Sequence, residues 1–352
     1  MPSEAVREVL LDGSEGEGGG QILRTALSLS AATGRPFRIV RIRARRPNPG
    51  LAAQHLAAVR AAAATCSAAV EGDRVGSQEL EFRPLELRPL REHFEIGTAG
   101  ATTLVLQTIA LPLALAPGDS EVSVGGGTHV EWAPAFDYLW PHWTGWMARL
   151  GLGVRARLAR AGYYPKGGGL IRSEIAGGAF VRPLELREEP GPLELRGRVV
   201  ITRLDERIAR RIARTAEHEF EREGLYAPVE IAHVEGPESG VAFFVYASRG
   251  GLSTACTSSL GRRGKPAELV AREASRAMLA HLATGAALDP HLADQLVAPL
   301  ALAGGESRYT TSELTPHLLT NLRTAAAFTG LRYEVKGETG APGEVRIVPA
   351  GD

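Results

Sequence analysis

The chain has 352 residues, of which 44% are hydrophobic, and its 40 lysines and arginines balance 40 aspartates and glutamates. A chain of this length can bury most of its unfolded surface, as one large domain or two smaller ones. Balanced charge excludes a global field that attracts nucleic acid, so such a partner has to be held by a local patch.

Cysteine usage and hydropathy indicate a soluble, cytoplasmic protein. Cys66 and Cys256 are the only cysteines, too few for a disulfide scaffold or a cysteine zinc site. The N-terminal segment MPSEAVREVL lacks the basic-then-apolar order of a signal peptide. The longest apolar stretch, residues 102–118, is too short and interrupted to span a bilayer. We therefore expect no membrane partner.

The first predicted unit begins at a glycine-rich loop, residues 16–20 (GEGGG). Apolar residues at helical spacing follow as far as Thr33, which predicts an amphipathic helix. Residues 37–46 (FRIVRIRARR) predict a strand, and residues 51–66 predict a second helix.

The same order of elements returns twice. The second copy comprises a loop and helix at 97–118, a strand at 120–128 and a helix at 134–151. The third copy comprises a helix at 291–305, a strand at 307–314, a helix at 315–330 and a strand at 331–337. We therefore predict an α/β fold whose large domain consists of three repeated β/α units, with helices on one face of several sheets.

The repeat is interrupted before its third copy. The interruption predicts strands at 197–204, 228–236, 241–248 and 252–261 and helices at 205–223 and 266–285. A segment of about a hundred residues is domain-sized, and its flanks are rich in proline and glycine. We predict a catalytic domain of residues 1–185 and 286–352, and a smaller inserted α/β domain of residues 186–285.

Glu17, inside the glycine-rich loop, is the first candidate site residue. Such a loop before a helix is typical of phosphate binding, but the Walker lysine is missing and a carboxylate is present. A divalent cation between carboxylate and phosphate would explain the glutamate. A solvated side chain in a flexible loop is the alternative.

Arg43, Arg45 and Arg46 end the strand predicted at 37–46. Strand alternation should send Arg43 and Arg45 to one side and Arg46 to the other. Guanidinium groups match phosphate oxygens in a bidentate manner. A solvated or salt-bridged sheet edge is the alternative.

His317 follows Pro316 in the first turn of a predicted helix, where Thr315 can serve as N-cap. The positive helix end favours the neutral, nucleophilic imidazole, although a structural histidine is the alternative. Asp294 and Gln295 open another helix and suit either its first turn or a nucleotide pocket.

Taken together, the motifs resemble those of RNA 3′-terminal phosphate cyclases. The blocks that carry the resemblance run from about Leu11 to Asn321 and are LDGSEGEGGGQILRTALSLS, IRARRPNPGL..QHLAAV, GTAGATTLVLQT, GYYPKGGG, LADQLVAPLALAGG and PHLLTNL. The resemblance implies three β/α units, each like the C-terminal domain of a translation initiation factor, plus an inserted domain. Enolpyruvyl transferases share this general plan.

The resemblance also implies a reaction in three steps. A histidine attacks the α-phosphorus of ATP, releases diphosphate and becomes histidyl-AMP. The adenylate passes to an RNA 3′-phosphate, and the 2′-hydroxyl then expels AMP to leave a 2′,3′-cyclic phosphate. The expected ligands are ATP, Mg²⁺ or Mn²⁺, and RNA with a 3′-terminal phosphate. The oligomeric state stays open, with a homodimer as one alternative.

The family's roles fall on individual positions of this chain. The nucleophile falls on His317 and the metal ligand on Glu17. The ATP-binding positions are Gln107, His291, Leu292, Ala293, Asp294 and Gln295. The positions lining the phosphate and RNA-end site are Arg24, Arg43, Arg46 and Gln54. Some members carry tyrosine where this chain has His291, and a histidine ring can also stack on a nucleotide.

Two other functions are alternatives to the cyclase reaction. A catalytically silent relative that serves ribosome assembly would not need His317, Glu17 and the LADQ stretch together. A carboxyvinyl transferase of the same architecture needs basic residues for a small anionic substrate and has no use for the cyclase motifs. The lysine-adenylating route of polynucleotide ligases is excluded, since no K-x-D-G tetrapeptide occurs. We read the turn around Lys166 as a hairpin.

Overall fold

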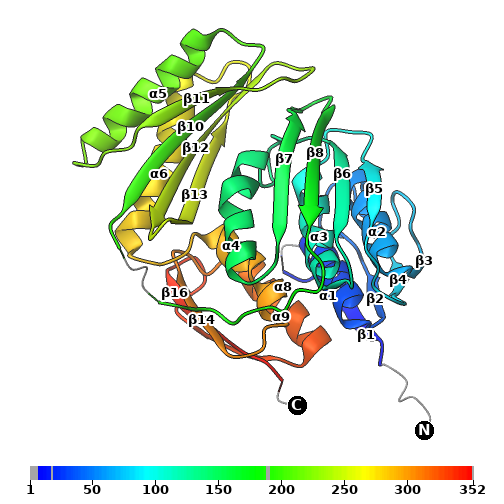
Figure 1. Ribbon diagram of the computed structural model, residues 1–352. Coiled ribbons are helices and arrows are strands. Elements are labelled where there is room, and N and C mark those ends of the chain that lie inside the picture. Colours follow the sequence, from blue (N-terminus) through cyan, green and yellow to red (C-terminus); the bar gives the residue numbers. More distant parts are fainter. Residues whose placement is uncertain (1–6, 17–18, 188–190, 351–352) are drawn as a thin grey trace.

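The computed structural model describes residues 7–16, 19–187 and 191–350. It contains four sheets of four strands each (Figure 1). The first sheet and its helices comprise β1 (Val9–Asp12), α1 (Gln21–Thr33), β2 (Phe37–Val40), α2 (Ala53–Cys66), β3 (Ala69–Glu71) and β4 (Leu80–Arg83). The second comprises β5 (Arg91–Glu95), α3 (Thr102–Leu115), β6 (Ser120–Gly126), η1 (Tyr138–Trp143), α4 (Thr144–Arg149), β7 (Val154–Arg160) and β8 (Gly169–Ile175).

The third sheet is assembled from two distant parts of the chain. Its elements are β9 (Glu185–Leu186), α7 (Pro290–Gln295), α8 (Val297–Leu300), β14 (Ser307–Thr311), α9 (Pro316–Thr329), β15 (Arg332–Lys336) and β16 (Gly343–Val348). Between β9 and α7 lie β10 (Glu194–Thr202), α5 (Glu206–Glu221), β11 (Val229–His233), β12 (Gly240–Arg249), β13 (Leu252–Leu260) and α6 (Ala267–Thr284). We call this part the inserted segment.

Three of the sheets follow one path. Their strand orders are β1-β2-β4-β3, β5-β6-β8-β7 and β9-β14-β16-β15. In each, the first two strands are parallel and the remaining pairs are antiparallel. The predicted α/β fold with three repeated β/α units is therefore confirmed, and the inserted segment enters after the first strand of the third unit.

The inserted segment has a different topology, with the strand order β11-β10-β12-β13. Helices α5 and α6 pack on each other and against these strands (Figure 1). The side chain of Asp205 caps α5 by accepting a hydrogen bond from Arg207 N. Apolar side chains that include Ile212, Phe220 and Phe243 form a core separate from the main one.

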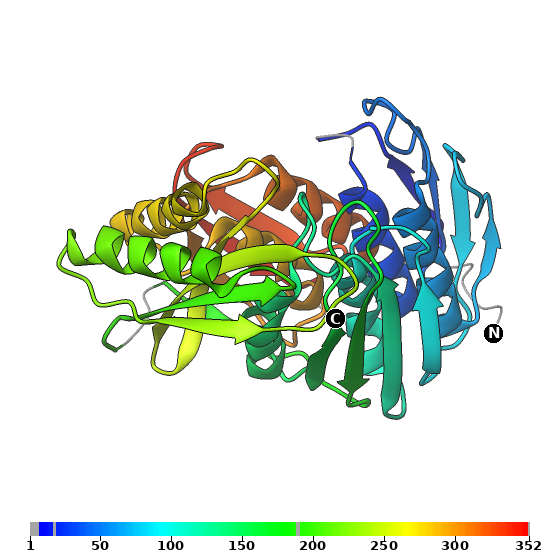
Figure 2. The same ribbon diagram turned by 90° about the horizontal axis from the view of Figure 1, so that it is seen from above.

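The helices of the three units meet in the middle of the larger part of the molecule, with the sheets outside them (Figure 2). Helix α1 packs against α2, α3 and α9, and Leu23, Leu27, Leu106 and Phe328 are buried there. This packing brings the start of α1 close to the start of α9. Among the described residues, no helix combines the length and the apolarity needed to cross a bilayer.

Two local predictions are wrong. The strand predicted at 37–46 ends at Val40, because Arg41 and Arg43 have left-handed φ angles of 55° and 54° that extended backbone excludes. The helix predicted at 134–151 is broken at Trp140, whose φ and ψ are −116° and 126°. The following residue is a proline, which disfavours helical backbone at the residue before it.

Candidate active site

The first turn of α9 presents His317 at the protein surface. Thr315 Oγ1 accepts a hydrogen bond from Leu318 N at 3.0 Å, and Pro316 occupies the first helical position. The predicted helix start is therefore confirmed. The His317 side chain is 40% exposed, so the ring is accessible to a ligand.

The glycine-rich loop lies against this turn. A Cβ on Gly16 would collide with Thr320 Oγ1 of α9, and the φ of Gly16 is 59°. Gln21 Nε2 donates a hydrogen bond to His317 O at 3.1 Å. The loop and the first turns of α9, almost 300 residues apart in the sequence, are thus neighbours. Glu17, the predicted metal ligand, lies outside the described residues.

Asp294, at the end of α7, faces His317 from a second helix. Its carboxylate Oδ2 lies 4.0 Å from His317 Nδ1, and the side chain is only 10% exposed. Asn321 Nδ2 donates to Asp294 O at 2.9 Å, while Asn321 Oδ1 accepts from Thr25 Oγ1 at 2.7 Å. One buried amide therefore fixes α1, α7 and α9 relative to one another.

Arg45 and Arg46 both reach the glycine-rich loop. Arg45 Nη1 donates to Gly16 O at 3.2 Å, and a Cβ on Gly19 would lie 3.4 Å from Arg46 Nη2. The prediction that alternation separates Arg46 from Arg45 is wrong, because the arginines leave a turn and not a strand.

Arg24 and Arg43 add partly buried positive charge. Burial lowers the pKa of the Arg24 guanidinium to about 10, although the charge of Asp294 opposes this shift. Burial, and then the charge of Arg46, lower the pKa of Arg43, whose Nη1 donates to Gly50 O at 2.8 Å. Desolvated cations of this kind gain most from an anionic ligand.

His55, which sequence reasoning missed, lies among these cations. Burial and the charges of Arg24 and Arg43 lower its pKa to about 3, so the ring is neutral at physiological pH. His55 Nδ1 accepts a hydrogen bond from Ala52 N at 3.2 Å, and its Nε2 faces Gly20. The residue lies in the stretch QHLAAV, directly after Gln54, but nothing in the local pattern distinguishes its buried ring.

The two predicted glutamines make contacts between units. Gln107 Nε2 donates to Gln295 Oε1 at 2.9 Å and thereby joins α3 to α7. Gln54 Oε1 accepts from Ala101 N at 3.1 Å, so it holds the loop that precedes α3. In the LADQ stretch, His291 is exposed, whereas the side chains of Leu292 and Ala293 are buried in the core.

Asp289 holds the start of α7, a role that sequence reasoning also missed. Its Oδ1 accepts hydrogen bonds from His291 N and Leu292 N, both at 2.9 Å. Its Oδ2 lies 2.8 Å from His142 Nε2 and accepts from Cys256 N at 3.3 Å. Burial alone would raise the pKa of Asp289, but the bonds and charge of His142 hold it below its ordinary value. Contacts from the second unit and the inserted segment thus position this helix.

In the described part of the chain, no group of three or more His, Cys, Asp or Glu side chains could hold a metal ion. A magnesium site can use fewer protein ligands than this, because substrate phosphates supply the others. Mg²⁺ is commonly bound in that way, by one or two carboxylates together with substrate phosphates.

Comparisons with known proteins agree with the resemblance. Residues 15–335 match the family model described as RNA 3′-terminal phosphate cyclase. Proteins of that name are 45% identical in Methylococcus capsulatus, over 96% of this chain and 95% of the relative, and 41% identical in Methanopyrus kandleri, over 97% and 99%. A solved enolpyruvyl transferase, NikO from Streptomyces tendae, aligns with a TM-score of 0.27 and 19% identity over 47% of this chain and 33% of that one.

Proposed function

The chain belongs to the RNA 3′-terminal phosphate cyclase family, and on that premise we propose that it converts an RNA 3′-terminal phosphate into a 2′,3′-cyclic phosphate in an ATP-dependent reaction. The observation that carries this proposal is the position of His317. Its partly exposed imidazole is in the first turn of α9, next to both the glycine-rich loop and the carboxylate of Asp294.

The first step makes His317 the nucleophile. Because Nδ1 faces Asp294, Nε2 is the nitrogen that attacks the α-phosphorus of ATP. A P–N bond forms, the bond to the β-phosphate oxygen breaks, and diphosphate leaves. Arg24, Arg43 and Arg46 supply positive charge for the phosphates during this transfer.

The later steps release the histidine and close the ring. An oxygen of the RNA 3′-phosphate attacks the adenylyl phosphorus, so the P–N bond breaks and an RNA-3′-pp-5′-A intermediate forms. The neighbouring 2′-hydroxyl then attacks the 3′-phosphorus and AMP leaves. A covalent intermediate divides one difficult transfer into easier ones.

Most of the remaining predicted residues bind substrates in this proposal. Gln107, His291, Asp294 and Gln295 contact the nucleotide, while Gln54 and the arginines contact the RNA end. Leu292 and Ala293 are buried and hold this stretch in place. Glu17, with substrate phosphates, would hold Mg²⁺ or Mn²⁺, which neutralises phosphate charge when bound. The hydrogen bond between Gln107 and Gln295 supports a joint role for these two residues.

We also propose that residues 186–285 act as an inserted domain beside a catalytic domain of residues 1–185 and 286–352, and that the protein is cytoplasmic. The separate apolar core of the inserted segment supports the first point. Cys66 and Cys256 are free, buried thiols, which is consistent with a reducing compartment.

Labelling with α-³²P ATP and Mg²⁺ or Mn²⁺ tests the proposal. The wild type should gain an acid-labile, base-stable label, and His317→Ala should gain none. His93→Ala, a change at another exposed histidine, should label normally. Label on His317→Ala would show that the nucleophile is another residue. RNA with a 2′-deoxy 3′-phosphate should be adenylylated and never cyclised.

A further inference from the structure

The surface along β7, called the groove below, has features that the proposed reaction does not use. β7 is the edge strand of the second sheet, because it pairs with β8 alone. Two hollows lie along it. One, of about 560 Å³, lies between β7 and the segment η1–α4. The other, of about 640 Å³, lies between the end of β7 and the inserted segment.

A β-bulge places three arginines on one face of β7. The register shifts between Leu158 and Arg160, so that Arg160 takes the position opposite Leu170. Since alternate residues share a face, Arg160 joins Arg155 and Arg157 on the exposed side. At about 3.4 Å per residue, these side chains span roughly 17 Å, the length of several nucleotides.

Arg172 of β8 adds a fourth charge, directly opposite Arg157. Like charges at opposed positions of a sheet destabilise it unless an anion lies between them. Arg155 forms a long ion pair with Glu174, in which Nη1 lies 3.8 Å from Oε2. Within the described residues, Arg157, Arg160 and Arg172 form no ion pair. We call Arg155, Arg157, Arg160 and Arg172 the arginine strip.

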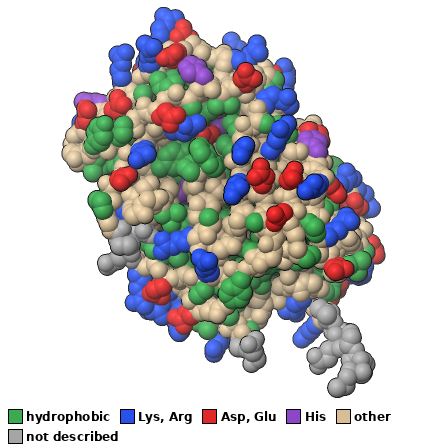
Figure 3. Space-filling model, viewed as in Figure 1, with side chains coloured by type: hydrophobic (Ala, Val, Ile, Leu, Met, Phe, Trp, Pro, Cys, Tyr) green, Lys and Arg blue, Asp and Glu red, His purple; other side chains and the backbone are tan. Residues whose placement is uncertain are grey.

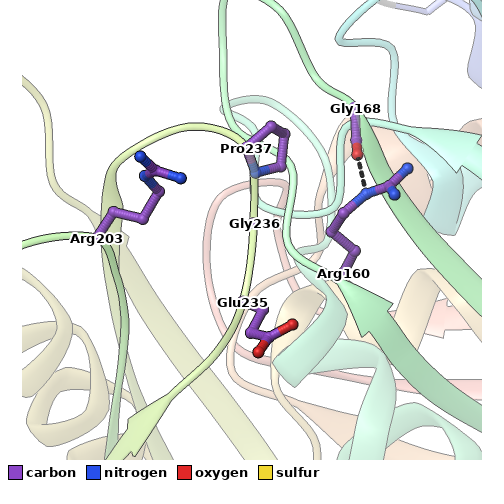
Figure 4. A pocket seen from close by; sticks show the side chains of 6 residues that line it. All are labelled: Arg160, Gly168, Arg203, Glu235, Gly236 and Pro237. Carbon is purple, nitrogen blue, oxygen red and sulfur yellow. Dashed lines mark hydrogen bonds between the residues drawn. The ribbon is translucent and has the colours of Figure 1, made fainter.

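The hollow at the end of β7 extends the positive surface. Arg160 Nε donates to Gly168 O at 2.6 Å, which fixes that guanidinium beside the loop of Gly236 and Pro237 (Figure 4). Arg203, in the inserted segment, stands on the other side of this loop (Figure 4). The carboxylate of Glu235 lines the same hollow (Figure 4), and within the described residues it forms no ion pair with Arg160 or Arg203.

The other hollow offers an aromatic ring. Trp140 is 43% exposed, and the Arg198 guanidinium lies 6.0 Å from the centre of its ring. Phe136, Pro141 and Leu158 line the same hollow. Hydrophobic side chains are visible in the hollowed region between the inserted segment and the second sheet, with basic ones on its border (Figure 3). Single-stranded nucleic acid is bound by this combination of a stacking ring and a basic groove.

The groove leads toward the RNA-end site. The turn that follows β7 packs on the loop before α3, since a Cβ on Gly167 would lie 2.9 Å from Ala99 Cα. That loop is the one that Gln54 holds through Ala101 N. A strand of RNA that ends near Gln54 therefore has a basic surface to continue along.

We propose that this groove binds the RNA on the 5′ side of the reacting end, with phosphodiesters on the arginine strip and Arg203 and one base stacked on Trp140. The identity of the ligand as RNA rests on the proposed function. An extended peptide could instead pair with the free edge of β7, but the arginines favour a polyanion.

Fluorescence anisotropy with single-stranded RNA ending in a 3′-phosphate tests the groove. For an RNA of about 20 nucleotides, the double variant Arg157→Glu, Arg160→Glu should bind at least tenfold more weakly, while a trinucleotide should bind as before. Its slope of log K against log salt should fall by about 1.4, at roughly 0.7 for each lost phosphate contact. Arg332→Glu, at an exposed position of β15, is the matched control and should change nothing.

Trp140 is tested separately. Trp140→Ala should weaken binding of the long RNA about tenfold, and Trp140→Phe should restore most of it, because a ring can still stack. Unchanged affinity in the double arginine variant would overturn the proposal, as would equal affinity of the wild type for long and short RNA. These binding measurements need no ATP, so their result does not depend on the labelling experiment. Failure of His317 labelling would refute the proposed function, whereas only the binding measurements decide whether the groove binds RNA.

Discussion

The carboxylate of Asp294 lies 4.0 Å from Nδ1 of His317, across the gap between α7 and α9. This distance is longer than a hydrogen bond, so the carboxylate acts on the ring through its electric field. The backbone that carries this carboxylate is held in place. Asp289 caps α7, and the backbone carbonyl of Asp294 accepts a hydrogen bond from Asn321. A negative charge is therefore held beside the proposed nucleophile.

Asp294→Asn should slow adenylylation of His317 by about 10²- to 10³-fold. When Nε2 bonds to phosphorus, the ring becomes cationic, and a charge about 4 Å away stabilises it by a few kcal/mol at an effective dielectric constant near 20. Single-turnover labelling measures the rate, and the melting temperature should stay close to that of the wild type. A variant that labels at the normal rate would show that Asp294 has no electrostatic role.

Gly20→Ala should destabilise the protein by about 1–3 kcal/mol through overpacking. The φ of Gly20 is −80°, which any residue tolerates, but a Cβ there would collide with the buried ring of His55. Gly19→Ala is the control, since its nearest neighbour would be Arg46 Nη2 at 3.4 Å. Urea unfolding should separate the two variants, and equal losses of stability would contradict the steric explanation.

Replacement of His55 should change how the free energy of unfolding depends on pH in the acid range. Its pKa is about 3 when folded and 6.5 in an ordinary environment, so between these values the unfolded chain binds a proton that the folded chain does not. Stability from this residue is complete above pH 6.5 and falls with decreasing pH, by up to about 1.4 kcal/mol per unit. His55→Gln should flatten the profile between pH 6.5 and 4; an unaltered slope would assign the pH dependence to other groups.

Asp289→Ala should cost about 3–5 kcal/mol and raise the KM for ATP. The change removes both capping bonds of α7 and leaves His142 without its buried carboxylate partner. Asp205→Ala, at the exposed cap of α5, should cost only about 1 kcal/mol. Urea unfolding and steady-state kinetics test this comparison. If Asp289→Ala lost no more stability than Asp205→Ala, the buried network would not be what holds α7.

The parts of the fold that follow from local pattern were predictable from the sequence. Apolar spacing identified the main helices, and Thr315-Pro316 marked the turn that presents His317. The left-handed backbone of Arg41 and Arg43 was not predictable, because arginine has no preference for it and the surrounding residues alternate like a strand. Such a conformation is imposed by contacts from elsewhere in the fold.

The supporting residues of the candidate site were hidden for a different reason. Asp289 contacts His142, which is 147 residues away in the sequence, and Asn321 contacts Thr25, which is 296 residues away. Each is an ordinary polar residue in its own helix or cap, and only the packing of three units against one another brings the partners together. Their importance depends on burial, which a single sequence does not display.

The hydroxyl of Thr310 binds both ends of the inserted segment: it donates to Arg187 O and accepts from Ala287 N, each at 3.0 Å. The chain thus leaves the third sheet and comes back to it at one point. A whole extra module can be gained, exchanged or lost at such a junction without any change in how the parent strands pair. The fold therefore tolerates the insertion or removal of a domain at this one junction.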